Sequence, residues 1–352
     1  MTLSALIKKA ISQGASDIHL VTGLPPSLRV AKEILMLDGD PLSEGDIRGM
    51  IDPALNDEQR RIFEADWQLC FSTIIDGLAH TRISVYRRLG KMEATLRLRS
   101  FEIPKLEALG IPESAIELTR KPNGLVLITG PTGVGKTTTF YSMLDRINSE
   151  RRVKIISVED PIEYLHSHKR SIVIQQEIGH DVKSYHSALM HILRLDPDVI
   201  CIGEMRDANT IAAALLAAET GHLVIATLHT ANAAQTMERI VTAVPPEERG
   251  GATIQLANCL RGVITQLLLP TVDGKSLVLA YEVMLANAAV RSNIRENKLA
   301  SINDAIQSGR SEGMCSLDMC LRDLYQSGRI TYDTAASYAK NPKLIHGQGE
   351  GK

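Results

Sequence analysis

The sequence has 352 residues, of which 44% are hydrophobic and 23% are charged, and its formal net charge at pH 7 is −2. This is the composition of an ordinary water-soluble globular protein, and the length favours two domains over one. A net charge so close to zero argues against a nucleic-acid-binding protein, which usually carries a strong basic excess.

Residues 1–100 carry the pattern of a small α+β domain. Helical apolar spacing over residues 3–12 is followed by two alternating, strand-like stretches, SDIHLV and PSLRV. Ser43 marks the start of a helix, and either Asn56 or Asp57 marks the start of the next one. The stretches HTRISVYRR and EATLRLRSF then alternate as strands around the short turn LGK, which predicts a hairpin.

The pattern changes after the first hundred residues. Residues 101–122 contain three prolines and one glycine, so we expect an interdomain connector with a short helix inside it. Over residues 123–284, apolar strand-like runs such as LVLITG and HLVIATL alternate with helical stretches, which predicts a mostly parallel sheet covered on both faces. Residues 285–342 are expected to be helical, and residues 343–352 are expected to be disordered.

A phosphate-binding motif opens the second domain. The stretch GPTGVGKT matches G-x-x-x-x-G-K-[ST], follows a predicted strand and precedes a predicted helix. Its glycines permit positive φ, so that backbone N–H groups can converge on a phosphate, and the helix start adds its positive dipole end. Lys136 can reach the β and γ phosphates, and the Thr137 hydroxyl can ligate Mg²⁺. ATP and Mg²⁺ are therefore the expected ligands, with nucleotide contacts from Gly130, Pro131, Thr132, Gly133, Val134, Gly135, Lys136, Thr137 and Thr138.

Carboxylates follow two of the other predicted strands. Glu204 lies just past the apolar run 199–202, and Gly203 takes the place where many enzymes with this motif have an aspartate. Glu159 and Glu163 follow the strand-like run KIISV. Because ligands bind at the carboxyl ends of parallel strands, these side chains can hold Mg²⁺ or activate water. The sequence does not decide which glutamate does which; the predicted metal ligands are Thr137, Glu163 and Glu204.

Two histidines, His222 and His229, flank the last of the predicted parallel strands. Their spacing is not that of a metal pair. A histidine near the γ phosphate can hydrogen-bond it and sense its loss, whereas the alternative for each is a capping or core hydrogen bond. We therefore treat both as candidate site residues.

No feature of the chain predicts a membrane span or a disulfide framework. No run approaches about 18 uninterrupted apolar residues, and the N-terminus lacks the apolar core of a signal peptide. The five cysteines include no C-x-x-C pair, so we expect reduced thiols in a cytoplasmic protein.

Taken together, these stretches resemble the secretion and type IV pilus hexameric ATPases, and within them the PilT-type retraction ATPases. The resemblance is carried by GASDIHL, TGPTGVGKTTT, SVEDPIEY, DPDVICIGEMRD and AETGHLVIATLHTANAAQTMERIV, and it extends over nearly the whole chain. Glycine before Glu204 is typical of this family. Residues 289–296 correspond to the AIRNLIRE signature of the retraction subgroup; they keep both arginines and differ at three positions.

The resemblance implies a PAS-like N-terminal domain, a RecA-like ATPase domain and a ring of six chains, with nucleotide bound between the two domains. It also implies that Arg82 and Arg97 face a neighbouring nucleotide, although Arg99 is interchangeable with Arg97 and an exposed strand face is the alternative. His222 and Arg239, both in the histidine-containing stretch, join the expected nucleotide contacts. The implied partners are an inner-membrane pilus platform protein and a paralogous pilus ATPase, and the implied location is the cytoplasmic side of the inner membrane, reached through those partners.

Several functions stay open at this point. The chain is expected to be the motor of type IV pilus retraction, an accessory PilU-like paralogue, or a type II or type IV secretion motor. A RecA-like nucleic-acid translocase would require basic loops, against which the balanced charge argues. A nucleotide-gated scaffold with slow hydrolysis is the remaining alternative.

Overall fold

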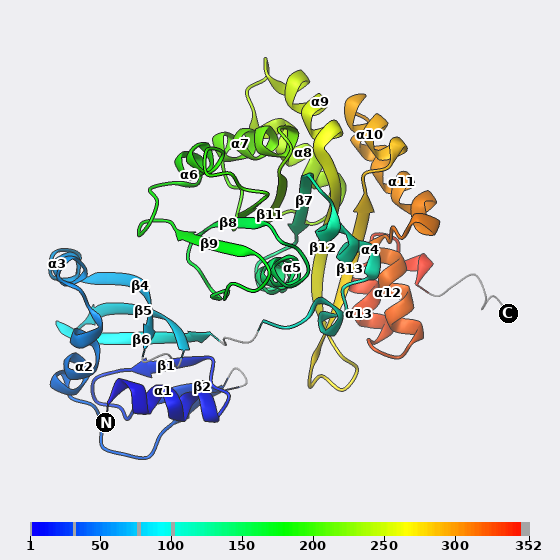
Figure 1. Cartoon of the computed structure of the whole chain (residues 1–352). Coiled ribbons are helices and arrows are strands. Elements are labelled where there is room, and N and C mark those ends of the chain that lie inside the picture. Colours follow the sequence, from blue (N-terminus) through cyan, green and yellow to red (C-terminus); the bar gives the residue numbers. More distant parts are fainter. Residues whose placement is uncertain (1, 31–32, 76–78, 100–102, 346–352) are drawn as a thin grey trace. The chain divides into compact units, whose positions relative to one another are not determined.

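The computed structural model describes residues 2–30, 33–75, 79–99 and 103–345. The chain divides into two compact units (Figure 1). The first comprises Met1–Glu102 with Pro161–Leu165, and the second comprises Ile103–Asp160 with His166–Lys352. Of the expected disordered tail, residues 346–352 lie outside the described residues. The domain boundaries given above stay predictions.

The first unit is built on a six-stranded antiparallel sheet with the strand order β3-β2-β1-β6-β5-β4. Its strands are β1 (Asp17–Leu20), β2 (Ser27–Val30), β3 (Glu33–Met36), β4 (Gln68–Ile75), β5 (Ala79–Arg88) and β6 (Lys91–Arg99). The predicted hairpin is formed by β5 and β6. Leu89 and Gly90 connect them, both at positive φ, as a tight two-residue turn requires.

Three helices cover one face of this sheet, namely α1 (Leu3–Ser12), α2 (Glu44–Ile51) and α3 (Asp57–Asp66). Their apolar residues form one buried cluster with alternate strand residues such as Ile18 and Leu96. Ser43 caps α2, as predicted, and Asn56 rather than Asp57 caps α3. Strand residues between the buried ones point to the opposite face of the sheet.

The second unit is built on a seven-stranded sheet with the order β13-β12-β7-β11-β10-β8-β9. The strands from β12 to β9 are parallel, and β13 is antiparallel to β12. The strands are β7 (Gly124–Thr129), β8 (Lys154–Glu159), β9 (Ile172–Glu177), β10 (Val199–Ile202), β11 (Leu223–Leu228), β12 (Leu260–Pro270) and β13 (Leu277–Leu285). The predicted fold class, with an antiparallel sheet domain followed by a mostly parallel one, is confirmed.

Helices lie on both faces of the second sheet (Figure 1). One face is covered by α6 (Tyr185–Ile192), α7 (Ala208–Glu219), α8 (Ala233–Ala243), α9 (Arg249–Cys259), α10 (Ala288–Arg295) and α11 (Ile302–Ser308), which share one buried cluster with the strands. The other face carries α5 (Lys136–Glu150). A separate cluster joins β13 to α12 (Leu317–Gln326) and α13 (Tyr332–Tyr338). The central strands β7, β8, β10 and β11 are almost entirely buried because both faces are covered.

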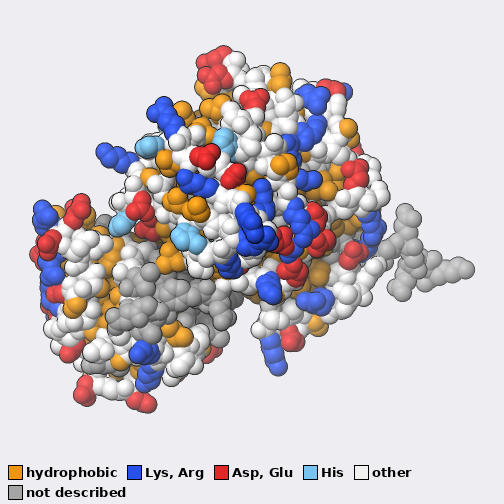
Figure 2. Space-filling model, in the orientation of Figure 1, with side chains coloured by type: hydrophobic (Ala, Val, Ile, Leu, Met, Phe, Trp, Pro, Cys, Tyr) orange, Lys and Arg blue, Asp and Glu red, His pale blue; other side chains and the backbone are white. Residues whose placement is uncertain are grey.

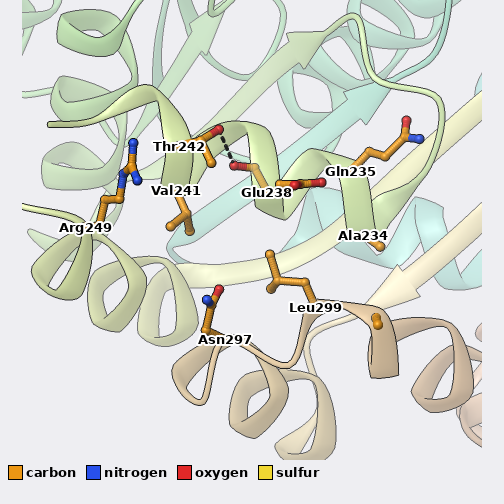
Figure 3. A pocket seen from close by; sticks show the side chains of 9 residues that line it. Ala234, Gln235, Glu238, Val241, Thr242, Arg249, Asn297 and Leu299 are labelled. Atoms are coloured by element: carbon orange, nitrogen blue, oxygen red, sulfur yellow. Dashed lines mark hydrogen bonds between the residues drawn. The ribbon is translucent and has the colours of Figure 1, made fainter. Parts of the chain in front are cut away.

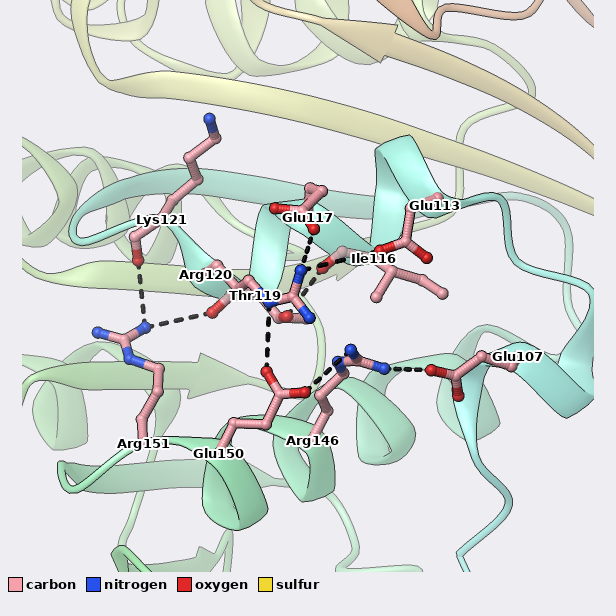
Figure 4. Close-up of polar contacts among 10 residues, drawn as sticks. All are labelled: Glu107, Glu113, Ile116, Glu117, Thr119, Arg120, Lys121, Arg146, Glu150 and Arg151. Atoms are coloured by element: carbon pink, nitrogen blue, oxygen red, sulfur yellow. Dashed lines mark hydrogen bonds and ion pairs between the residues drawn. The ribbon is translucent and has the colours of Figure 1, made fainter.

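The predicted connector is fixed to α5 by charged side chains (Figure 4). It contains the 3₁₀ segments η2 (Leu106–Leu109) and η3 (Glu117–Arg120) and the single turn α4 (Glu113–Ile116). Arg146 of α5 pairs with Glu107, and the Arg120 Nε lies 3.4 Å from a carboxylate oxygen of Glu150. From Ile103 onward the connector is therefore part of the second unit, whereas residues 101–102 lie outside the described residues.

Candidate nucleotide-binding site

A glycine-rich loop, residues 130–135, joins β7 to α5. Gly130, Gly133 and Gly135 have φ values of 137°, 82° and 87°, in the region that favours glycine. At Gly130 a Cβ atom would lie 2.5 Å from the carbonyl oxygen of Gln266, so no side chain fits there. The strand, loop and helix that the motif predicts are all present.

The start of α5 offers hydrogen-bond donors to an anion. Gly135 is the residue before the helix, and it has no side chain with which to cap the first N–H groups. Thr137 and Thr138 lie in the first turn, which is fully described and contains no acidic residue. Uncapped N–H groups and the positive end of the helix dipole are the usual features of a phosphate-binding helix start.

The Lys136 side chain folds back over the loop. Its Nζ donates hydrogen bonds to the carbonyl oxygens of Gly130 and Pro131, at 2.8 Å and 2.7 Å. Burial lowers the pKa of Lys136, although the nearby charge of Glu204 opposes that shift. The ammonium group is thus held at the mouth of the loop by backbone acceptors.

His229 connects the loop to a carboxylate on a neighbouring strand. Its Nδ1 lies 3.3 Å from Lys136 Nζ and 3.4 Å from the Thr132 hydroxyl, and its Nε2 lies 3.2 Å from Glu204 Oε1. An ammonium group only donates and a carboxylate only accepts, so an imidazole with its proton on Nε2 satisfies both contacts. Strands β7, β10 and β11 are parallel, so their carboxyl ends lie at the same edge of the sheet. Lys136, Glu204 and His229, which follow these strands, therefore come together there.

Glu204 is held in its ionised form. Its second oxygen, Oε2, accepts a hydrogen bond of 2.8 Å from Arg206 Nη2. Burial acts to raise the pKa of Glu204, but the hydrogen bond and the charge of Arg206, together with the hydrogen bond from His229, more than offset it, so the pKa lies below its ordinary value. A carboxylate that stays ionised can accept a proton from water.

Gly203, which precedes Glu204, is closely surrounded by its neighbours. A Cβ atom at this position would lie 3.1 Å from the Tyr185 hydroxyl and 3.3 Å from the backbone of both Glu159 and Val158. These contacts are tighter than ordinary van der Waals packing. A side chain at residue 203 would therefore require these neighbours to shift by a few tenths of an ångström.

Glu159 is buried at the end of β8 and held by neighbouring donors. Its carboxylate accepts hydrogen bonds from the Ser157 hydroxyl at 2.6 Å, from Gln175 Nε2 at 3.1 Å and from the Tyr141 hydroxyl. Tyr141 belongs to α5, and its ring also stacks on His166, with ring centroids 5.6 Å apart. Glu159 and His166 bracket the segment that contains Glu163, so α5 holds both ends of that segment.

The two candidate arginines of the first unit stand side by side. Arg82 on β5 is directly opposite Arg97 on β6, and Asp17 on β1 is opposite Arg97 on its other side. Arg97 Nε donates to Asp17 Oδ1 at 2.8 Å, and Arg82 Nε lies 3.0 Å from Cys70 Sγ. Burial acts to raise the pKa of Asp17, but the hydrogen bonds from Arg97 and Ser16 hold it below its ordinary value. The side chain of Arg99 lies outside the described residues.

The remaining candidates are His222, Arg239 and Glu163. His222 precedes β11, at the opposite edge of the sheet from the loop, and its Nδ1 contacts the carbonyl oxygen of Ala217 at 2.9 Å. Six residues of strand, about 20 Å, separate it from the edge at which the loop lies, and its assignment to the nucleotide contacts stays a prediction. Arg239 of α8 approaches the carbonyl oxygen of Arg206 at 3.5 Å. Glu163 groups with the first unit, so neither unit alone brings it to Lys136.

Sequence reasoning missed two residues that organise this site, Arg206 and Tyr141. Arg206 carries a signal, because it stands two residues after Glu204 in the same short loop. Tyr141 carries none, because its aromatic ring fits the apolar stripe of a helix equally well.

Comparison with known proteins places these features in a family. Residues 78–340 match the family described as type II/IV secretion system protein. The chain belongs to this family. PilT, the type IV pilus retractation ATPase of Pseudomonas aeruginosa, is 40% identical over 97% of this chain and 99% of its own length. PilU, a type IV pilus ATPase of the same organism, is 35% identical over 96% of this chain and 89% of its own length. The crystal structure of the pilus retraction motor PilT with bound ADP has a TM-score of 0.92, at 42% identity, and covers 98% of this chain and 99% of that one.

Membership of the type II/IV secretion family confirms the resemblance drawn from the sequence motifs. These relatives are named as ATPases, and one was solved with ADP, so the family supports nucleotide binding and ATP hydrolysis. Among the helices that the structure describes, none has both the length and the apolar character needed to cross a bilayer.

Proposed function

We propose that this chain is a Mg²⁺-dependent ATPase motor that drives type IV pilus retraction. The observation that carries the proposal is the chain of contacts from Lys136 through His229 to Glu204, which lies beside a glycine loop at the ends of three parallel strands. The near full-length similarity to PilT supports the retraction assignment.

In this proposal the loop from Gly130 to Gly135 and the first turn of α5 bind the phosphates of ATP. Lys136 donates to two loop carbonyls at present, and phosphate oxygens would replace those weaker acceptors. Thr138 belongs to the same first turn and would stand beside the residues that bind the phosphates.

The donor set fits Mg²⁺. This ion binds through one or two protein oxygens together with nucleotide phosphates and water, and the Thr137 hydroxyl with a carboxylate of Glu204 or Glu163 would supply them. No group of three or more His, Cys, Asp or Glu side chains gathers as a metal cage within the described residues, which suits an ion held largely by the nucleotide. When bound, the ion would neutralise phosphate charge.

We assign water activation to Glu204. Its carboxylate is ionised and is oriented from two sides by His229 and Arg206. Glu159 has its oxygens occupied by three donors, so we assign it a positioning role rather than a proton-accepting one. Glu163 would then support the metal or the water once the two units close on a nucleotide.

The motor is proposed to be a homo-hexamer in which Arg82 and Arg97 reach the nucleotide of a neighbouring chain. Loss of the γ phosphate would remove the contacts that favour the closed arrangement, and the site would open. The partner displaced by this movement would be the platform protein in the inner membrane, approached from the cytoplasmic side, with a paralogous pilus ATPase as a further partner.

The proposal is tested by steady-state ATP turnover of three proteins with and without Mg²⁺. Lys136→Ala should lose nucleotide binding, and Glu204→Gln should bind ATP but turn over at least about 100-fold more slowly than wild type. Retained turnover in Lys136→Ala would refute the site, and equal turnover of Glu204→Gln and wild type would favour the scaffold alternative. Turnover stimulated by single-stranded DNA would favour a translocase. Light scattering in the presence of ATP measures the molar mass of the assembly and so tests the proposed ring of six chains.

A PilU-like accessory role is a second candidate, supported by the 35% identity to that relative. Complementation of Pseudomonas mutants that lack either ATPase separates the two. Restored twitching in the PilT-deficient strain supports the main motor, whereas restoration only in the PilU-deficient strain supports the accessory role.

A further inference from the structure

A groove between α7 and α9 lies outside the site described above. It has a volume of about 320 Å³, and its floor is formed by Leu215, Val244 and Ala252, all buried. Gly251 lies on its wall and contributes no side chain. The floor of this groove between the two helices is therefore apolar.

Exposed apolar side chains flank this groove. Leu216 on α7 is 39% exposed, and Ile254 on α9 is 54% exposed. Leu216 is one helical turn from Ala212, and Ile254 is three residues from Gly251, so both stand next to residues that line the groove. The apolar surface thus continues from the floor onto both helices.

The rim of the groove is acidic. Glu247 and Glu248 line it and are exposed, and Glu219 at the end of α7 accepts a hydrogen bond of 2.9 Å from Gln255 on its wall. No Lys or Arg is among the described lining residues. In Figure 2 red acidic and orange hydrophobic side chains lie next to one another at the top of the second unit, where Figure 1 places the loop before α9.

A second groove shows that this combination is not a general feature of the surface. It lies between α8 and the segment after α10 and is larger, at about 480 Å³ (Figure 3). Its lining contains both Glu238 and Arg249 and so favours neither sign of charge. Arg249 also donates to the carbonyl oxygen of Val244.

We propose that the α7–α9 groove binds a basic amphipathic helix of a partner protein. Apolar residues on one face of such a helix would fill the floor, and its flanking Lys and Arg would pair with Glu219, Glu247 and Glu248. The acidic rim would repel anionic lipids and nucleic acids. Cytoplasmic segments of inner-membrane proteins carry an excess of Lys and Arg, as such a helix would. The choice of an inner-membrane partner rests on the proposed function.

Gly251 offers a variant that fills the groove without disturbing the fold. A Cβ atom on Gly251 or on its neighbour Gly250 meets nothing within 4 Å, and neither residue has a positive φ. Only Gly251 lines the groove. Gly251→Leu is therefore the blocking variant, and Gly250→Leu is its matched control, since both changes improve helix propensity alike.

The probe is a fluorescent amphipathic peptide of leucine and lysine, about 14 residues or four helical turns long, with a second peptide in which glutamate replaces every lysine. Fluorescence anisotropy should detect binding of the lysine peptide to the wild-type chain and no binding of the glutamate peptide. Gly251→Leu and the double variant Glu247→Lys/Glu248→Lys should weaken the affinity at least tenfold, whereas Gly250→Leu should not. Asp38→Lys/Asp40→Lys, an equal charge change at exposed positions of the first unit, should bind as wild type does.

Three results overturn the inference. One is equal binding by Gly251→Leu and Gly250→Leu, and another is loss of binding in the Asp38→Lys/Asp40→Lys control. The third is a change in oligomer mass caused by Gly251→Leu alone, which would make the groove a contact between copies of this chain. ATP turnover without peptide should be unchanged in all these variants. Active Lys136→Ala protein would refute the proposed function while leaving the peptide result to stand or fall separately.

Discussion

The imidazole Nε2 of His229 lies 3.2 Å from Oε1 of Glu204, so a residue at the end of β11 orients a carboxylate that follows β10. The other ring nitrogen contacts Lys136 at the phosphate loop. Displacement of Lys136 by a phosphate would therefore be transmitted through one ring to the proposed general base. In the proposed function, this relationship would connect nucleotide binding to water activation within a single chain.

Replacement of His229 by alanine is expected to lower kcat about 10- to 100-fold while leaving KM for ATP within about twofold, because the ring orients Glu204 and does not form the loop. His229→Gln, which can still bridge a donor and an acceptor, should recover part of the rate. Steady-state kinetics on the three proteins measure the effect. A rise in KM with unchanged kcat would place His229 in nucleotide binding alone.

Removal of Arg206 is expected to change the pH dependence of turnover. The Arg206 hydrogen bond is one cause that holds the pKa of Glu204 below its ordinary value, so Arg206→Ala should raise that pKa. Glu204 must be ionised to accept a proton, and its pKa marks the acidic limb of the kcat profile. That limb should move to higher pH in Arg206→Ala and stay near the wild-type position in Arg206→Lys. An acidic limb that coincides in all three proteins would rule out this control by Arg206.

Tyr141→Phe is expected to weaken both the fold and the catalytic rate. The change keeps the ring that stacks on His166 but removes the hydroxyl that donates to the buried Glu159 carboxylate. A lost hydrogen bond to a buried charged group costs about 1–3 kcal/mol of unfolding free energy. Urea unfolding measures this loss, and kcat should fall with little change in KM because the segment bearing Glu163 loses an anchor. Wild-type kcat in a destabilised Tyr141→Phe protein would limit Tyr141 to folding.

Arg97→Ala is expected to reduce stability in a pH-dependent way. The pKa of Asp17 is depressed in the folded chain, so its pairing stabilises the fold above the ordinary Asp pKa of about 4 and is lost as pH falls through the folded value. Arg97 is half exposed, which limits the effect to about 1 kcal/mol near pH 7. Unfolding curves of the variant and wild type should therefore differ at pH 7 and converge once the pH falls below the depressed pKa of Asp17, and a difference that stays constant with pH would contradict the ionic origin.

Local patterns in the sequence predicted the phosphate loop and the central strands. The loop could be predicted from sequence because Gly130, Gly133 and Gly135 adopt positive φ, a backbone conformation that other residues rarely adopt. The buried parallel strands could be predicted because short runs in which every residue is apolar are typical of strands that are covered on both faces. In both cases the physical cause lies within a few consecutive residues.

Long-range pairing was beyond the reach of such patterns. The register that sets Arg97 between Arg82 on one neighbouring strand and Asp17 on the other joins strands that are up to 80 residues apart. β3 and β9 have many partly or fully exposed positions and show no clean alternation, and they form because a neighbouring strand offers hydrogen bonds. The hydrogen bond from Tyr141 to Glu159 likewise depends on how α5 packs on the sheet, which cannot be predicted from a short stretch of sequence.

Mixed rings are expected to show whether the arginines act on a neighbouring chain. Arg82→Ala/Arg97→Ala leaves its own phosphate loop intact, and Lys136→Ala leaves its own arginines intact. If the arginines act in trans, some interfaces of a ring assembled from both variants combine an intact loop with intact arginines. ATP turnover of the mixture should then exceed that of either variant alone, whereas arginines that act on their own chain leave every subunit defective and the mixture inactive. Mixing each variant with wild type under the same conditions shows that subunits exchange, so an inactive mixture with proven exchange would refute the shared site.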